Sequence, residues 1–174
     1  MTRKKEFSRA DGYSETDLLV ASRDHLLSAL LLFEEGSLYG LDSAGYLSHL
    51  SLELLLKATL LFLEDKFPEC HDLEQLLRRL QAAGLKLNIP VAQDDVVKRL
   101  RAFYGLRYPD PTTPVSISQP DAPLIRDTWD SLWAQLPEAL RARMPELYEV
   151  GRDGRLRKGG RAIMIREKKP RDST

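Results

Sequence analysis

Two arginines and two tyrosines near residue 105 are the side chains in this chain best suited to chemistry. Arg101, Tyr104 and Tyr108 are three and four residues apart, so a helix places them on one face. Arg107 lies about a hundred degrees round the helix from Tyr108, and Pro109 predicts that the helix ends near there. Paired guanidiniums can hold a phosphate, and tyrosine rings can stack on bases. In the plainer alternative, the tyrosines pack the helix end and the arginines pair with acidic neighbours.

A glutamate and a lysine stand one turn apart on the most apolar predicted helix. Glu53 precedes Lys57 by four residues, which is the favoured orientation for an ion pair, and His49 lies one turn before them. Two interpretations stay open. The pair belongs to a solvent-facing polar seam, or it forms a polar line facing Arg101 or Arg107, where Glu53 orients a guanidinium.

His71 and Asp72 mark the start of another predicted helix. Asp72 suits the N-cap, and His71 suits a hydrogen bond to a loop carbonyl. The single cysteine, Cys70, excludes an internal disulfide and a zinc site made of several cysteines. No two histidines have the spacing of metal ligands, and the sequence contains no glycine-rich phosphate loop or GxSxG motif. We therefore expect no metal and no cofactor.

Apolar spacing and capping residues predict five helices and no strand before residue 146. The predicted boundaries, in chain order, are Ser14 to Gly36, Asp42 to about Asp65, His71 to Gly84, Asp94 to about Tyr108, and a last helix that starts at Asp121 and carries Trp129 and Trp133. This pattern indicates an all-α fold, an up-and-down antiparallel bundle of about five helices. After Pro145, short apolar runs between glycine turns predict a small C-terminal β-meander.

Charge and residue pattern divide the chain into four expected parts: a basic N-terminal extension (1–14), the helical bundle (15–145), the β-meander (146–167) and a basic tail (168–174). Net charge is zero overall, but residues 1–9 carry +3, residues 10–150 carry −9 and residues 151–174 carry +6. A basic segment of this kind is either a solvated tail or a contact surface for phosphate or an acidic partner.

No feature of the sequence indicates a membrane or a secreted protein. The N-terminus leads into no apolar signal region. The leucine-rich run from Leu50 to Leu63 is interrupted by Glu53 and Lys57, and we expect it to be too short and too charged to span a bilayer. We expect a soluble, cytoplasmic protein without membrane contact.

Taken in order, these parts resemble the HEPN family of small helical bundles over roughly residues 15–137. The matching segments are Ala44–Leu47 and Leu52–Ala58 on one helix, His71-Asp72-Leu73 with Leu76-Leu77 on the next, and Tyr104-x-x-Arg107-Tyr108-Pro109-Asp110. The resemblance implies an up-and-down bundle that commonly forms a homodimer. It also implies nucleotide- or RNA-related work, often beside a nucleotidyltransferase partner in toxin–antitoxin or defence systems.

Many HEPN proteins are metal-independent ribonucleases with an arginine followed, after four to six residues, by a histidine. After Arg101 those positions are Leu106, Arg107 and Tyr108, and no histidine elsewhere follows an arginine at that spacing. Arginine and tyrosine are poor general bases at neutral pH, so we expect a binding or regulatory member without catalytic residues.

The expected ligand is a nucleotide or RNA. We expect Arg101 and Arg107 to clamp its phosphate, and Tyr104, Tyr108 and Asp110 to line the pocket. Glu53 and Lys57 set the polarity of the pocket, and His71 is an auxiliary group. Two other functions remain open. One is an atypical metal-independent ribonuclease that uses Arg101, Arg107 and Tyr108 electrostatically. The other is a structural or assembly protein with Trp129 and Trp133 on an exposed dimer face.

Overall fold

The computed structural model describes residues 5–103, 117–145, 148–150 and 156–158. The chain divides into two units, Met1–Met144 and Pro145–Thr174, and each is described by itself. The expected boundaries at residues 14 and 167 are not tested by this division.

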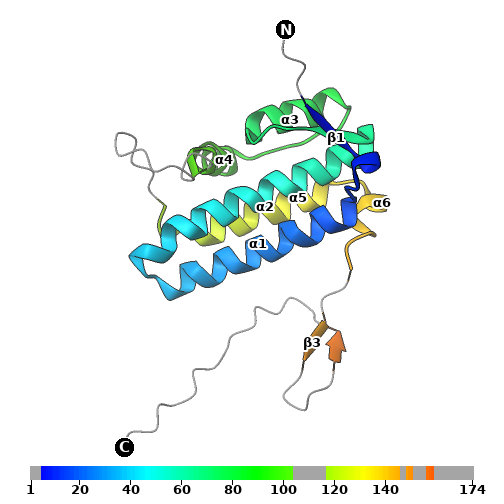
Figure 1. Cartoon of the computed structure of the whole chain (residues 1–174). Coiled ribbons are helices and arrows are strands. Elements are labelled where there is room, and N and C mark those ends of the chain that lie inside the picture. The colour runs from blue at the N-terminus through cyan, green and yellow to red at the C-terminus, as the bar shows by residue number, and fades with distance from the viewer. Residues whose placement is uncertain (1–4, 104–116, 146–147, 151–155, 159–174) are drawn as a thin grey trace, which may run out of the picture. The chain divides into compact units, whose positions relative to one another are not determined.

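The first unit is mostly helical (Figure 1). Its described helices are α1 (Glu15–Glu35), α2 (Leu38–Glu64), α3 (Leu73–Ala82), α4 (Val91–Phe103), α5 (Asp121–Gln135) and the short α6 (Glu138–Arg141). Helix α2 is central and contacts α1, α3, α4 and α5. In Figure 1, α1, α2 and α5 lie side by side, whereas α4 is seen nearly end-on. The expected helical character is confirmed in the sense that this unit is mostly helical, whereas the up-and-down order of five helices stays a prediction.

Local capping sets most helix boundaries. Ser14 accepts a hydrogen bond from the Asp17 amide at the start of α1, and Gly36 ends that helix in the left-handed conformation, with φ 64°. Helix α2 begins at Leu38, four residues earlier than expected, because Ser37 caps the Gly40 amide. Helix α4 likewise begins at Val91, directly after Pro90 and before the acidic pair that we expected to start it.

The expectation of no strand before residue 146 is wrong, because the first unit contains a two-stranded antiparallel sheet. Strand β1 (Glu6–Ser8) pairs with β2 (Lys66–Pro68), with Phe7 opposite Phe67. Phe7, Phe67 and Tyr13 form a cluster whose ring centroids are 5.1–5.7 Å apart. Strands of three residues are too short to show an alternating pattern in the sequence. Packing of these aromatic rings stabilises the pairing of the two strands. The expected N-terminal extension is therefore partly built into the first unit.

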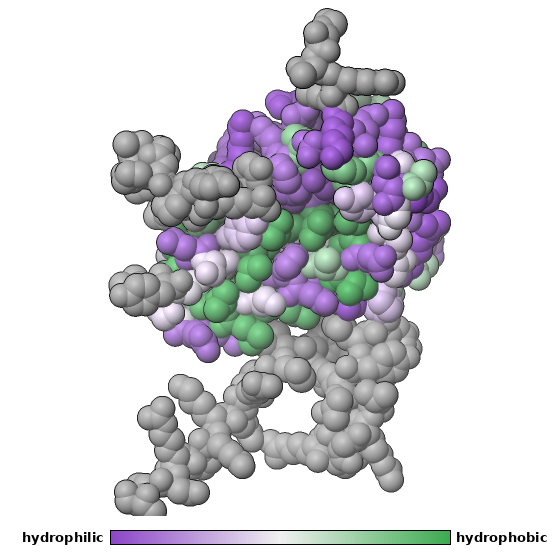
Figure 2. Space-filling model, viewed as in Figure 1, coloured by the Kyte–Doolittle hydropathy of each residue, from purple (hydrophilic) through white to green (hydrophobic). Residues whose placement is uncertain are grey.

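The core is apolar and centred on α2. Leu52, Leu55, Leu56 and Leu61 are at most 1% exposed. At Gly45, an added Cβ would lie 2.3 Å from the buried Phe103 ring, so glycine allows α2 and α4 to approach closely. Figure 2 shows further apolar surface in the middle of this face of the molecule.

By length and composition alone, α2 qualifies as a candidate membrane span between Gly40 and Glu64. However, 67% of that window is buried inside the protein. A helix that is apolar on all sides belongs in a core, and α2 serves as the core helix of this unit.

The tryptophans of α5 do not form the exposed face that the assembly hypothesis requires. Trp129 is 7% exposed and stacks on Trp133, with ring centroids 5.4 Å apart. Its indole Nε1 donates a hydrogen bond to Ser22 Oγ, and Ser22 donates to the Ser51 carbonyl. Trp129 therefore packs into the core and ties α5 to α1 and α2.

The second unit contains one described hairpin. Strand β3 (Tyr148–Val150) pairs antiparallel with β4 (Leu156–Lys158). The third strand of the predicted meander, near residues 162–165, lies outside the described residues.

Candidate functional site

Glu53 and Lys57 lie inside the bundle, not on its surface. The residues are 2% and 6% exposed, and Lys57 Nζ donates to Glu53 Oε1 at 2.7 Å. The interpretation of a solvent-facing seam is therefore wrong. Because α2 is covered by helices on most sides, even its polar positions are enclosed.

Two histidines from different parts of the chain meet the same carboxylate. His71 Nδ1 lies 2.9 Å from Glu53 Oε1, so this histidine, which we expected on a loop carbonyl, has a carboxylate partner. His49 Nε2 lies 3.3 Å from Glu53 Oε2, which is within ion-pair distance. His49 Nδ1 also lies 3.0 Å from the Leu100 carbonyl on α4. We call Glu53, Lys57, His49 and His71 the Glu53 network.

The Glu53 network keeps its carboxylate ionised. Burial raises the pKa of Glu53, but the hydrogen bond from His49, the charge and hydrogen bond of Lys57, and the charge of His71 together outweigh burial. The result is a pKa lowered from 4.5 to about 2. Such a weakly basic carboxylate is unsuited to take a proton at neutral pH. Glu53 therefore positions other groups.

Asp72 joins the start of α3 to the end of α4. Its Oδ1 accepts hydrogen bonds from the amides of Glu74 and Gln75, which confirms it as the N-cap of α3. Its Oδ2 lies 2.8 Å from Arg101 Nη2, and Glu74 Oε2 lies 3.4 Å from Arg101 Nη1. Arg101 is therefore paired with carboxylates of α3 and its cap, not with Glu53. Arg107, the other guanidinium that the polar-line interpretation named, lies outside the described residues.

Comparison with known proteins identifies the fold family. A family model described as the HEPN domain matches residues 16–127. The chain belongs to the HEPN family. Neither the curated proteins nor the solved structures contain a match. Membership in HEPN indicates a nucleic-acid-related or ribonuclease-like module, as the resemblance in the sequence implied.

The described part of this HEPN domain contains half of the predicted site. Glu53, Lys57 and His71 come together, and Arg101 stands beside them through Asp72. Four further predicted site residues, Tyr104, Arg107, Tyr108 and Asp110, lie outside the described residues. Their roles stay predictions.

One member of the network was absent from the predicted site. His49 is fully buried and links Glu53 on α2 to the Leu100 carbonyl of α4. Its position one turn before Glu53 was the available signal in the sequence. Among the described residues, no group of three His, Cys, Asp or Glu side chains is arranged to hold a metal ion.

Proposed function

We propose that this HEPN domain binds the phosphate groups of a nucleotide or RNA beside the end of α4 and holds them without cleaving them. The observation that carries the proposal is the Glu53 network, which fixes three elements around one buried carboxylate. The residues with phosphate-binding chemistry begin at Arg101, where these elements meet.

The network contacts α4 near the last of its described residues. His49 Nδ1 lies 3.0 Å from the Leu100 carbonyl. On the other side of the carboxylate, His71 directly precedes the α3 cap residue that pairs with Arg101. Buried polar contacts thus hold the described end of α4, next to Arg101.

Arg101 retains donors for a ligand although it is ion-paired. The side chain is 51% exposed, and its two described contacts engage Nη1 and Nη2. A guanidinium carries five N–H donors, so a phosphate can add to these contacts or replace the longer one to Glu74. Arg107 supplies the second guanidinium in this proposal, with Tyr104, Tyr108 and Asp110 as lining.

The test is equilibrium binding to a fluorescent single-stranded RNA and to ATP, measured by anisotropy. Arg101→Ala and Arg107→Ala should each weaken binding at least about tenfold and reduce the salt dependence of the affinity. Arg99→Ala is the matched control, because Arg99 lies on α4 but pairs with Asp121. Circular dichroism should show the same helix content in all three variants. Equal affinities for all four proteins would refute the proposal.

An atypical metal-independent ribonuclease is the second candidate, and one observation favours it. His71 is held by Glu53 and directly precedes Asp72, the partner of Arg101, so the structure brings a histidine from another element near the motif arginine. Cleavage of RNA in the presence of EDTA, abolished in both His71→Ala and Arg101→Ala, would support this function. Intact RNA after prolonged incubation would exclude it.

We further propose that the protein works in the cytoplasm as a homodimer beside a nucleotidyltransferase, in a toxin–antitoxin or defence setting. The apolar surface in Figure 2 is consistent with a partner surface. Light scattering at micromolar concentration should give twice the chain mass, and a monomer would contradict the dimer. Deleting residues 151–174 should flatten the salt dependence of RNA binding if the basic tail contacts RNA.

A further inference from the structure

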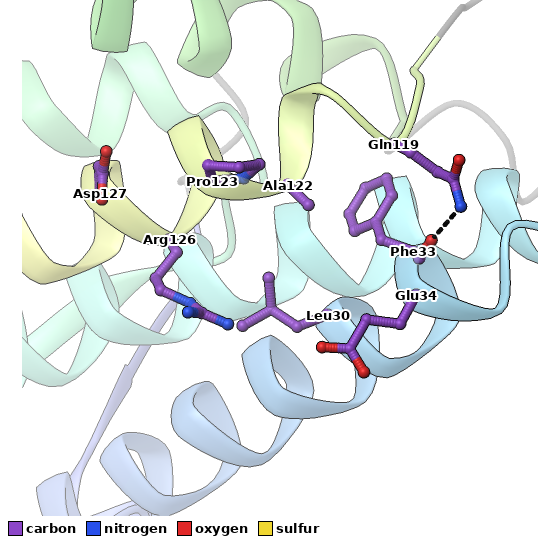
Figure 3. Close-up of a pocket in the computed structure, with 8 residues that line it drawn as sticks. All are labelled: Leu30, Phe33, Glu34, Gln119, Ala122, Pro123, Arg126 and Asp127. Carbon is purple, nitrogen blue, oxygen red and sulfur yellow. Dashed lines mark hydrogen bonds between the residues drawn. The ribbon is translucent and has the colours of Figure 1, made fainter. Parts of the chain in front are cut away.

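A cavity of about 400 Å³ lies between the second half of α1 and the start of α5 (Figure 3). It shares no residue with the Glu53 network. Leu30 and Phe33 of α1 and Ala122 of α5 give it an apolar wall. Small-molecule sites in proteins have this size and character, with a few polar groups that fix the ligand's orientation.

Two opposite charges stand at this cavity. Figure 3 shows the Arg126 guanidinium and the Glu34 carboxylate on either side of Leu30. Among the described residues, neither side chain has an ion pair or side-chain hydrogen bond, whereas Arg99 and Arg101 are paired. The cavity thus offers one cationic and one anionic group that a ligand can engage.

The rim of the cavity is fixed by specific contacts. Gln119 Nε2 donates a hydrogen bond to the Phe33 carbonyl at 2.9 Å. This bond joins the end of α1 to the segment that directly precedes α5. At Gly36 an added Cβ would lie 2.3 Å from Gln119 Nε2. Gly36 therefore both ends α1 and leaves room for the glutamine that defines the rim.

We propose that this cavity binds a free α-amino acid with a branched or aromatic apolar side chain. The ligand carboxylate meets Arg126, its ammonium meets Glu34, and its side chain packs on the wall of Leu30 and Phe33. A guanidinium binds a carboxylate through paired hydrogen bonds. A polyphosphate fits poorly, because Glu34 and the nearby Asp127 would repel it. The cavity is therefore distinct in chemistry from the proposed phosphate site.

The experiment is titration of the full-length ¹⁵N-labelled protein with L-leucine and L-phenylalanine, followed by amide chemical shifts. Saturable shifts should concentrate in residues 30–36 and 119–127. Arg126→Gln and Glu34→Gln should each weaken binding by about tenfold or more, since each removes a charge-assisted hydrogen bond. Arg78→Gln, on α3, is the matched control and should bind as the wild type does.

Two modified ligands separate the charges. N-acetyl-L-leucine lacks the ammonium, so its weaker binding should be indifferent to Glu34→Gln. L-Leucinamide lacks the carboxylate and should be indifferent to Arg126→Gln. Absence of saturable shifts, shifts elsewhere in the protein, or equal affinity for L-leucine and its N-acetyl form would overturn the assignment.

Discussion

Replacing Glu53 with glutamine removes the charge that Lys57, His49 and His71 share inside the bundle. The pKa of Glu53 is lowered from 4.5 to about 2, and this difference corresponds to about 3 kcal/mol of stability at pH 7. Breaking a buried ion pair by removing one partner costs a similar amount, about 3–5 kcal/mol. We therefore expect Glu53→Gln to lose about 3 kcal/mol and roughly 6–12 °C in Tm.

The loss should depend on pH in a defined direction. A carboxyl whose pKa is lowered by folding stabilises the protein above its unfolded pKa, and that stabilisation disappears as the pH falls through the folded pKa. For Glu53 the window runs from about pH 4.5 down to about pH 2. The difference between wild type and Glu53→Gln should fall from about 3 kcal/mol at pH 7 to about 1 kcal/mol at pH 3. Urea denaturation followed by circular dichroism at both pH values measures it.

Two variants control for other effects. Glu74→Gln removes a partly exposed carboxylate 3.4 Å from Arg101 and should cost less than about 1 kcal/mol. The double variant Glu53→Leu, Lys57→Met removes both charges of the pair and should lose less than Glu53→Gln, because no buried cation is left unpaired. A Glu53→Gln protein within 1 kcal/mol of wild type, or an equal deficit at pH 7 and pH 3, would refute the reasoning.

Three further substitutions test the packing, each by urea denaturation. Gly45→Ala places a methyl group against the Phe103 ring and should cost about 1–3 kcal/mol, and wild-type stability would contradict the close approach of α2 and α4. Asp72→Ala removes the α3 cap and should cost about 1 kcal/mol, most of it restored in Asp72→Asn. Ser22→Ala deprives the Trp129 indole of its acceptor and should cost about 1–3 kcal/mol with a change in tryptophan fluorescence, whereas an unchanged spectrum would place the indole elsewhere.

Local rules explain which parts of the fold were predictable. Ser14, Gly36 and Asp72 act on residues within one turn of themselves, so the chain near them is enough to place a helix end. The start of α2 was placed too late because its cap, Ser37, directly follows the glycine that ends α1. The pairing of β1 with β2 joins segments about sixty residues apart, and no local pattern encodes it.

The candidate site shows the same division between local and tertiary information. The contact between Glu53 and Lys57 follows from helical spacing, and the structure confirms it. Its burial does not follow from spacing, because it depends on which helices cover α2. The approach of His71 to Glu53 is a contact across 18 residues, and the pairing of Arg101 with Asp72 also joins separate elements. The sequence therefore predicted the contacts within one helix, whereas the partners contributed by other elements could not be assigned from it.

The charges around Glu53 and Arg101 help to distinguish phosphate binding from RNA cleavage, in addition to the absence of the arginine–histidine motif. Glu53 is held ionised by its neighbours, so it orients His71 but is a poor acceptor for a substrate proton. Arg101 is already engaged by two carboxylates, which moderates its attraction for phosphate. In the ribonuclease proposal that invokes His71, cleavage depends on this histidine, whereas binding requires only that the arginines contact phosphate. His71→Ala therefore separates the activities: a binding module should keep its affinity for RNA within a few-fold, and a nuclease should lose its cleavage.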